Sequence, residues 1–112
     1  TIAIMSNDVK QYPDDSYENM KLFAKNYDFN FPYLYDESQN VAKEYGAVCT
    51  PDIFGFNNKN LLCYRGRIDS GVMNSDHKKI DRELYNAMVK IKNDGIGPDK
   101  QLNSFGCSIK WK

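Results

Sequence analysis

Residues 45–56 constrain the fold of this chain most, because a glycine, a Thr-Pro pair and a short apolar run follow one another there. Gly46 can adopt the left-handed conformation with which many helices end. Thr50-Pro51 then favours a turn, since proline cannot continue a helix or pair within a central strand. The run Ile-Phe-Gly-Phe at 53–56 is typical of a short strand. The sequence therefore predicts a short helix, a turn and a strand in direct succession.

Length and charge indicate one soluble domain. The 112 residues carry 15 lysines and arginines against 15 aspartates and glutamates, so the formal net charge is zero. This balance argues against a nucleic-acid partner, whose backbone requires concentrated positive charge. No apolar run approaches the roughly 20 residues that cross a bilayer, and the N-terminus lacks a signal-peptide pattern. We expect a cytoplasmic protein without a membrane partner.

The cysteines and the histidine argue against a metal site. Cys49, Cys63 and Cys107 are an odd number with no C-x-x-C pair, which is untypical of a disulfide framework or a zinc site. His77 is the single histidine. We therefore expect no metal site.

The first half of the chain predicts a strand, a helix, an extended piece and a second helix. Residues 2–5 are apolar throughout, as in a strand buried on both faces. Asp15 can cap a helix with Glu18 three residues later. Residues 29–35 contain Pro32 and read as an extended piece or an edge strand. Asp36 and Gln39 repeat the capping pattern before the helix that Gly46 ends.

The second half predicts a hairpin, a helix and a tail. The apolar runs at 53–56 and 61–64 flank four residues rich in asparagine, which accepts the positive φ that hairpin loops need. Residues 65–75 read as a loop. From Asp76, apolar residues recur at three and four positions until Gly95. We expect a domain at 1–96 and a C-terminal tail at 97–112, laid over its surface. The element order is mixed α/β.

Six short phrases, spread over nearly the whole chain, carry a family resemblance. They are Ile4-Met5-Ser6-Asn7-Asp8, Tyr12-Pro13-Asp14-Asp15-Ser16, Phe31-Pro32-Tyr33-Leu34-Tyr35-Asp36-Glu37, Cys49-Thr50-Pro51-Asp52, Tyr64-Arg65-Gly66-Arg67-Ile68-Asp69 and Gly106-Cys107-Ser108-Ile109-Lys110-Trp111-Lys112. In their order and spacing the chain resembles the alkyl hydroperoxide reductase/thiol-specific antioxidant branch of the thioredoxin-like superfamily, which comprises redoxin and peroxiredoxin-like proteins.

The resemblance implies a fold and a function. It implies a partial thioredoxin-like fold, a three-layer α/β/α arrangement with a mixed sheet, a C-terminal β-hairpin and a helix. It also implies a cis Thr50-Pro51 bond in a loop against a redox sulfur, although only about one X-Pro bond in twenty is cis. The implied function is that of a thiol-disulfide oxidoreductase or thiol peroxidase in antioxidant defence and cell redox homeostasis. Because cysteine oxidation supplies this chemistry, the resemblance implies neither a metal nor an organic cofactor.

The chain departs from the family at its reactive centre. In the family the redox cysteine lies in a turn at the start of a helix, before the region that matches residues 2–5. A helix N-terminus lowers the thiol pKa there and makes thiolate available. This sequence contains no such turn. We therefore expect that an N-terminal catalytic βα unit precedes Thr1 in the parent protein and that these 112 residues alone are inactive.

The candidate site residues are Cys49, Thr50 and Pro51. Thr50 and Pro51 would shape the redox site, against the alternative of an ordinary trans turn. Cys49 would lie within reach of the reactive thiol and could resolve or sense its oxidised form. The alternative, which we favour, is that Cys49 is a small buried residue that supports the loop.

Other candidate residues have plainer interpretations. Arg65 and Arg67 could stabilise a thiolate and a polarised peroxide, but two solvated arginines at a strand end are the simpler interpretation. Cys63 fits a packing position in a strand. Cys107 could form a mixed disulfide, although an exposed tail thiol is the simpler interpretation. His77 is expected to be solvent-exposed.

The expected partners follow from the implied chemistry. They are a peroxide or disulfide substrate, a thiol reductant protein and, because the sheet is truncated, a second copy of the chain in a homodimer. The alternative function is a non-catalytic thioredoxin-like binding module that holds a peptide at the Thr50-Pro51 loop and the exposed sheet edge. A flavodoxin-like nucleotide binder fits poorly, because no glycine-rich phosphate loop follows residues 2–5.

Overall fold

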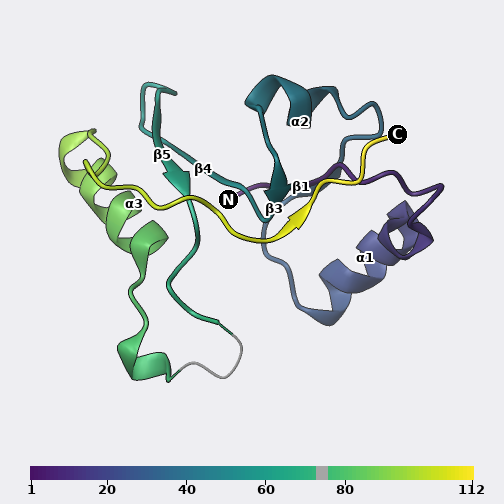
Figure 1. The fold of residues 1–112 in the computed structure, drawn as a ribbon, viewed down its shortest axis with the longest axis horizontal. Coiled ribbons are helices and arrows are strands. Elements are labelled where there is room, and N and C mark those ends of the chain that lie inside the picture. Colours follow the sequence, from purple (N-terminus) through teal and green to yellow (C-terminus); the bar gives the residue numbers. More distant parts are fainter. Residues whose placement is uncertain (73–75) are drawn as a thin grey trace. The chain divides into compact units, whose positions relative to one another are not determined.

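The computed structural model describes residues 1–72 and 76–112, so the last three residues of the loop expected at 65–75 lie outside the described residues. The chain divides into two compact units, Thr1–Val48 with Ser108–Lys112, and Cys49–Cys107. The described residues form three α-helices and short parallel and antiparallel strand pairs, which confirms the α/β class (Figure 1). The expected domain limits at 1–96 and 97–112 stay a prediction.

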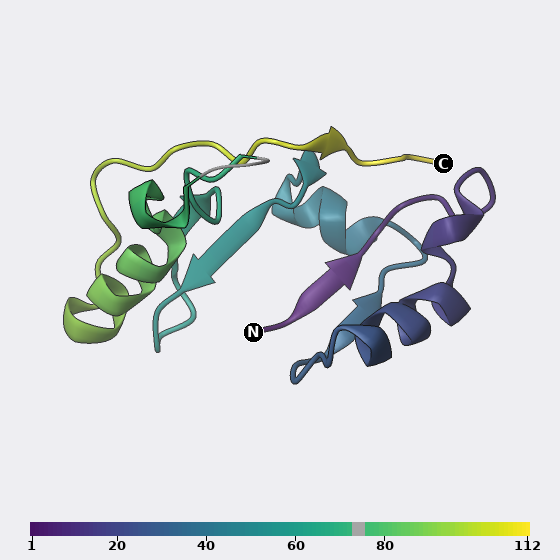
Figure 2. The same cartoon turned by 90° about the horizontal axis from the view of Figure 1, so that it is seen from below.

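The first unit is a parallel strand pair with helices around it. Its elements are β1 (Ala3–Met5), the 3-10 turn η1 (Pro13–Asp15), α1 (Tyr17–Asn26), β2 (Tyr33–Tyr35) and α2 (Asn40–Tyr45). β1 and β2 run side by side with Ile4 opposite Leu34, as Figure 2 shows. Met5 and Met20 are buried, whereas Ile4 is 45% and Leu34 48% exposed. β1 is therefore buried on one face, although its apolar pattern predicts burial on both.

The N-cap of helix α1 lies one residue after the predicted cap, Asp15. Ser16 is the N-cap, and its Oγ accepts a hydrogen bond from the backbone N–H of Asn19 at 3.4 Å. Asp15 lies in η1 instead, where its Oδ2 accepts from Asn7 Nδ2 at 2.8 Å. The predicted capping box that starts at Asp15 is wrong, because the 3-10 turn turns that side chain toward Asn7.

Helix α2 ends where the sequence predicts and begins later. Gly46 is its C-cap at φ 65°, as expected. At the other end Asp36 Oδ2 accepts from the backbone N–H of Ala42 at 3.0 Å. Gln39 is itself the N-cap, at φ 63°, and its side chain makes no capping bond. The predicted capping box is therefore wrong, because the Asp36 carboxylate bonds to Ala42 and the Gln39 N–H donates to the Asp36 backbone carbonyl.

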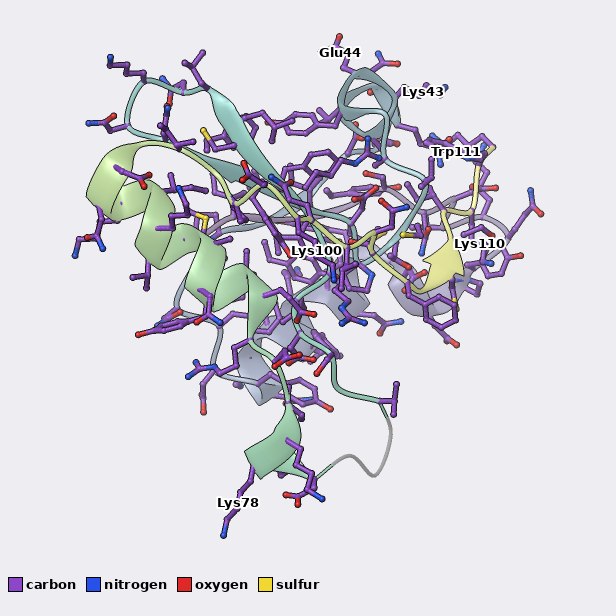
Figure 3. All side chains as sticks on the ribbon, turned by 60° about the vertical axis from the view of Figure 1, so that its left-hand side comes forward. Lys43, Glu44, Lys78, Lys100, Lys110 and Trp111 are labelled. Atoms are coloured by element: carbon purple, nitrogen blue, oxygen red, sulfur yellow. The ribbon has the colours of Figure 1, made fainter. Side chains whose placement is uncertain are left out.

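Residues Ser108–Lys112 belong to the first unit and are bonded to it. Ile109 is buried at 5% exposure. Asn7 Oδ1 accepts from the backbone N–H of Lys110 at 2.9 Å, and the N–H of Asp8 donates to the Lys110 carbonyl at 2.8 Å. The Lys43 ammonium lies 5.8 Å from the centre of the Trp111 ring, and both side chains are labelled in Figure 3. This part of the tail is thus an integral part of the unit.

The second unit is a hairpin covered by a helix. Its elements are β3 (Cys49–Thr50), β4 (Ile53–Phe56), β5 (Leu62–Gly66), the 3-10 turn η2 (His77–Lys79), α3 (Glu83–Asp94) and the first residue of β6 (Cys107–Ser108). β4 and β5 are antiparallel, with Phe54 opposite Arg65, and Asn60 in their loop has φ 58°. The predicted hairpin is confirmed. Tyr64, Ala87 and Ile91 form the buried core where α3 packs on β5.

Helix α3 begins at Glu83, seven residues after the predicted start. Asp76 does cap a turn, since its Oδ1 accepts from the backbone N–H of Lys78 at 3.0 Å, but that turn is η2. Beyond it the backbone N–H of Ser70 donates to the Asp81 carbonyl at 2.9 Å, and the N–H of Asp81 donates to Ser70 Oγ at 2.8 Å. These long-range bonds use backbone groups that a continuous helix would need.

Candidate functional site

The three predicted site residues stand together at the start of the second unit. Cys49 and Thr50 form β3, and the Thr50-Pro51 peptide bond is cis, as predicted. Cys49 is half-buried, whereas Thr50 and Pro51 are exposed. Cys49 is therefore less accessible than the two residues that follow it.

Tail residues lie against one side of this turn. Thr50 Oγ1 donates a hydrogen bond to the Cys107 carbonyl at 3.3 Å. A Cβ built on Gly106 would come within 2.0 Å of the Thr50 carbonyl oxygen, so no side chain fits at that position. The thiol of Cys107 is exposed. Gly106 is thus required for the close backbone approach that fixes this side of the turn.

An ion pair lies next to the turn. Asp52, directly after Pro51, has a side chain only 5% exposed, and its Oδ2 lies 3.0 Å from Arg65 Nη2. Arg65 Nε donates to the other carboxylate oxygen at 3.4 Å, which makes the pair bidentate. The guanidinium also lies 4.9 Å from the centre of the Phe54 ring. Arg65 is therefore held by Asp52 and Phe54 and is not a freely solvated side chain.

The surroundings of Cys49 raise the pKa of its thiol. Burial raises the pKa of the Cys49 thiol, the nearby Asp52 carboxylate raises it further, and Arg65 lowers it by a smaller amount. The sulfur lies 3.6 Å from the Pro51 carbonyl oxygen, to which a protonated thiol donates. Because the thiolate is the nucleophile, Cys49 in this setting is a poor attacking group at neutral pH.

The remaining candidates have partners of their own. Arg67 Nε donates to Glu83 Oε1 at 2.9 Å, at the start of α3. Cys63 Sγ lies 3.3 Å from the Leu61 carbonyl oxygen and 3.5 Å from that of Gly95, and its single S–H can donate to either. His77 lies in η2 and is exposed, as expected. Of the two arginines, only Arg65 interacts electrostatically with Cys49.

The described ranges, 1–72 and 76–112, contain no group of three histidine, cysteine or acidic side chains arranged to hold a metal ion. Within the same ranges, no helix has the length and apolar character needed to cross a membrane.

The Thr50-Pro51 turn lies within a match to a known protein family. The sequence profile of the AhpC/TSA family matches residues 3–68, more than half of the chain. The chain belongs to the AhpC/TSA family. The match includes β1, the Thr50-Pro51 turn and the whole β4–β5 hairpin. None of the curated proteins compared with the chain matches it.

Two solved structures resemble this AhpC/TSA chain over nearly its full length. One is an uncharacterized conserved protein from Geobacillus kaustophilus, 46% identical with a TM-score of 0.87, which matches 99% of this chain and 59% of its own. The other is a hypothetical protein from Sinorhizobium meliloti 1021, 38% identical with a TM-score of 0.87, which matches 99% of this chain and 61% of its own. The chain thus spans about three fifths of the length of these relatives.

Asp52 is the site residue that sequence reasoning missed. It follows Pro51 in one of the phrases that carry the family resemblance, but nothing in its neighbourhood shows that its carboxylate is buried against Arg65, 13 residues later. The hairpin could have indicated this pair, because its register places Arg65 opposite Phe54 and so close to the start of β4. In this AhpC/TSA chain Asp52 raises the pKa of the Cys49 thiol, second only to burial as a cause.

Proposed function

We propose that this chain works within a thiol peroxidase or thiol–disulfide oxidoreductase of the redoxin type, built on a thioredoxin-like three-layer α/β/α fold. The observation that carries the proposal is the AhpC/TSA match, because it runs through the candidate turn. The parallel β1–β2 pair and the antiparallel β4–β5 hairpin with α3 against it are compatible with parts of such a fold.

The proposed chemistry needs a thiolate from outside these residues. The thiolate attacks one peroxide oxygen, the O–O bond breaks, and the other oxygen leaves as water or an alcohol after protonation. The sulfenic acid then condenses with a second thiol to a disulfide and releases water, and a thiol reductant protein restores both thiols. The raised pKa of Cys49 disfavours its thiolate, so in this proposal another cysteine supplies the attacking group.

Cys49, Thr50 and Pro51 then border the reaction centre without carrying out the attack. The exposed residues Thr50 and Pro51 offer a surface on which a bound peptide or disulfide substrate can lie. The half-buried Cys49 precedes them in β3. In this proposal the turn positions the substrate, and a peroxide or disulfide is the substrate class.

Activity measurements on two lengths of the protein test the proposal. Peroxide consumption and disulfide reduction are measured for the 112-residue chain and for the protein extended upstream through its next cysteine. We expect turnover only from the longer protein and its loss when that upstream cysteine is changed to serine. The matched control is Cys63→Ser, which removes a thiol bonded to Leu61 and Gly95 and should leave turnover intact.

Two outcomes would overturn the proposal. Turnover by the 112-residue chain alone would assign the chemistry to Cys49, Cys63 or Cys107. If the longer protein is folded and inactive with both substrate classes, the chain belongs to a non-catalytic binding module.

A further inference from the structure

Strand β5 has two edges, and the tail lies along the one that β4 does not use. β4 pairs with the inner edge, with Gly55 opposite Tyr64. After α3 the tail returns past β5, as the yellow-green segment of Figure 1 shows. Residues 97–104 then meet the outer edge, where Cys63, Arg65 and Arg67 turn their backbone groups outward.

Gln101 takes the place of a neighbouring strand at this edge. Its Nε2 donates to the Cys63 carbonyl at 3.0 Å, and its Oε1 accepts from the backbone N–H of Arg65 at 2.8 Å. A carboxamide has the same donor and acceptor as a peptide group, so one side chain satisfies two strand positions. A further bond from Nε2 to the Pro98 carbonyl, at 3.0 Å, holds the carboxamide in place.

The backbone of the segment is pressed against the same edge. The N–H of Arg67 donates to the Leu102 carbonyl at 3.0 Å. The side chain of Ser104 adds a bond at the end of β5, from its Oγ to the Gly66 carbonyl at 2.6 Å. A Cβ on Gly97 would lie 1.7 Å from the Cys63 carbonyl oxygen. Any side chain at position 97 would therefore push the segment away from β5.

We propose that residues 97–104 are a strap that masks a self-complementary strand edge, and that Gln101 is the residue that occupies it. When two β5 edges pair antiparallel about Tyr64, Cys63 of one copy faces Arg65 of the other. The carbonyl of Cys63 and the N–H of Arg65, which Gln101 now satisfies, then satisfy each other across the two copies. The occupant that the strap keeps out is a second copy of this chain.

The physical reason for such a strap is that unpaired edges promote association. A strand edge with free N–H and C=O groups is a template for another strand, and proteins cover or disrupt such edges. Arg65 and Leu62 lie on β5 and are exposed, so side-chain burial does little to protect this edge. The strap supplies that protection by hydrogen bonding.

Gln101→Ala tests the proposal, with Asn103→Ala as the matched control. Asn103 is an exposed amide in the same segment. Amide hydrogen exchange is measured by NMR at low protein concentration, and sedimentation velocity across a concentration series. In Gln101→Ala we expect the Arg65 amide to exchange about tenfold faster when dilute, as expected for one lost hydrogen bond. We also expect self-association at least fivefold stronger than in the parent, with the Arg65 amide protected again in the dimer.

A second variant keeps the proposal testable if Gln101→Ala fails to fold. Gly97→Val displaces the strap while Gln101 remains, and should associate like Gln101→Ala. Association through any other surface is common to the parent and all variants, so the differences between them report on β5. The proposal is wrong if either folded variant associates no more than the parent, or if Arg65 keeps its parental exchange rate in Gln101→Ala.

Discussion

The side chain of Gln39 holds the C-terminal segment of the first unit, and its removal gives the sharpest test of how that unit is stabilised. The residue is 2% exposed. Its Nε2 donates to the carbonyls of Ser6 at 2.7 Å and Lys110 at 2.9 Å, and its Oε1 accepts from the N–H of Lys112 at 3.0 Å. The Gln39 carboxamide thus links Ser6, just after β1, to Lys110 and Lys112, which lie more than 70 positions after Gln39.

The expected cost of Gln39→Ala follows from these three bonds. Each intramolecular hydrogen bond contributes a net 0.5–1.5 kcal/mol, roughly, and a buried partner left unsatisfied costs more. The Lys110 carbonyl keeps its bond from the N–H of Asp8, whereas the Ser6 carbonyl and the Lys112 N–H lose the bonds that Gln39 gives them. We predict a loss of about 2–4 kcal/mol in the free energy of unfolding, a large share of the roughly 5–15 kcal/mol of a typical domain.

Urea unfolding followed by circular dichroism measures this loss, at low protein concentration so that association does not contribute. The matched control is Asn40→Ala, the next residue, whose side chain is exposed at the start of α2. The control should change stability by less than about 0.5 kcal/mol. If Gln39→Ala is as stable as Asn40→Ala, the bonds to Ser6, Lys110 and Lys112 do not stabilise the unit and the reasoning fails.

Three further predictions concern acid stability, association and thiol reactivity. Burial alone would raise the pKa of Asp36, but hydrogen bonds from Ala42, Ser6 and Ser38 outweigh it and lower that pKa. The ionised Asp36 side chain therefore stabilises the fold above the unfolded pKa of about 3.9, and this stabilisation is lost as the pH falls below that value. Asp36→Asn should flatten the fall of the urea midpoint below about pH 4. An unchanged slope would contradict this prediction. The chain should self-associate in sedimentation experiments because Ile4 and Leu34 are half exposed on one sheet face, whereas a monodisperse, cooperatively unfolding monomer at high concentration would show that this face needs no cover. Asp52→Asn should speed iodoacetamide alkylation of Cys49 at about pH 8, because it removes a charge that raises the thiol pKa; a slower reaction would show that Asp52 acts otherwise.

Local chemistry explains which elements the sequence predicts well. Gly46 and Gly95 both end helices with positive φ, at 65° and 74°, because glycine adopts this conformation without a Cβ clash. Asn60 supplies the positive φ of the hairpin loop. At each of these positions a single residue type determines the backbone conformation, so no information from distant parts of the chain is needed.

The predictions that failed depend on distant partners. Gln39 matches a capping pattern, but it bonds to Lys110 and Lys112, which no local pattern indicates. Asp81 lies within the helical periodicity, but its backbone N–H and carbonyl are both hydrogen-bonded to Ser70. The same holds in the candidate site. Cys49 and the Thr-Pro turn can be read from the sequence, whereas the burial of Asp52 against Arg65 depends on hairpin packing.

The central claim is that this chain shapes a redox site whose attacking thiolate comes from elsewhere, and the ionisation of Cys49 tests it most directly. The measurement is the rate of iodoacetamide alkylation at Cys49 against pH, with the modified residue identified by mass spectrometry. We predict a midpoint above the ordinary thiol value of about 8.5, since burial and Asp52 both raise the pKa of Cys49. A midpoint near or below about pH 7 would show a reactive thiolate within the chain itself and would contradict the account.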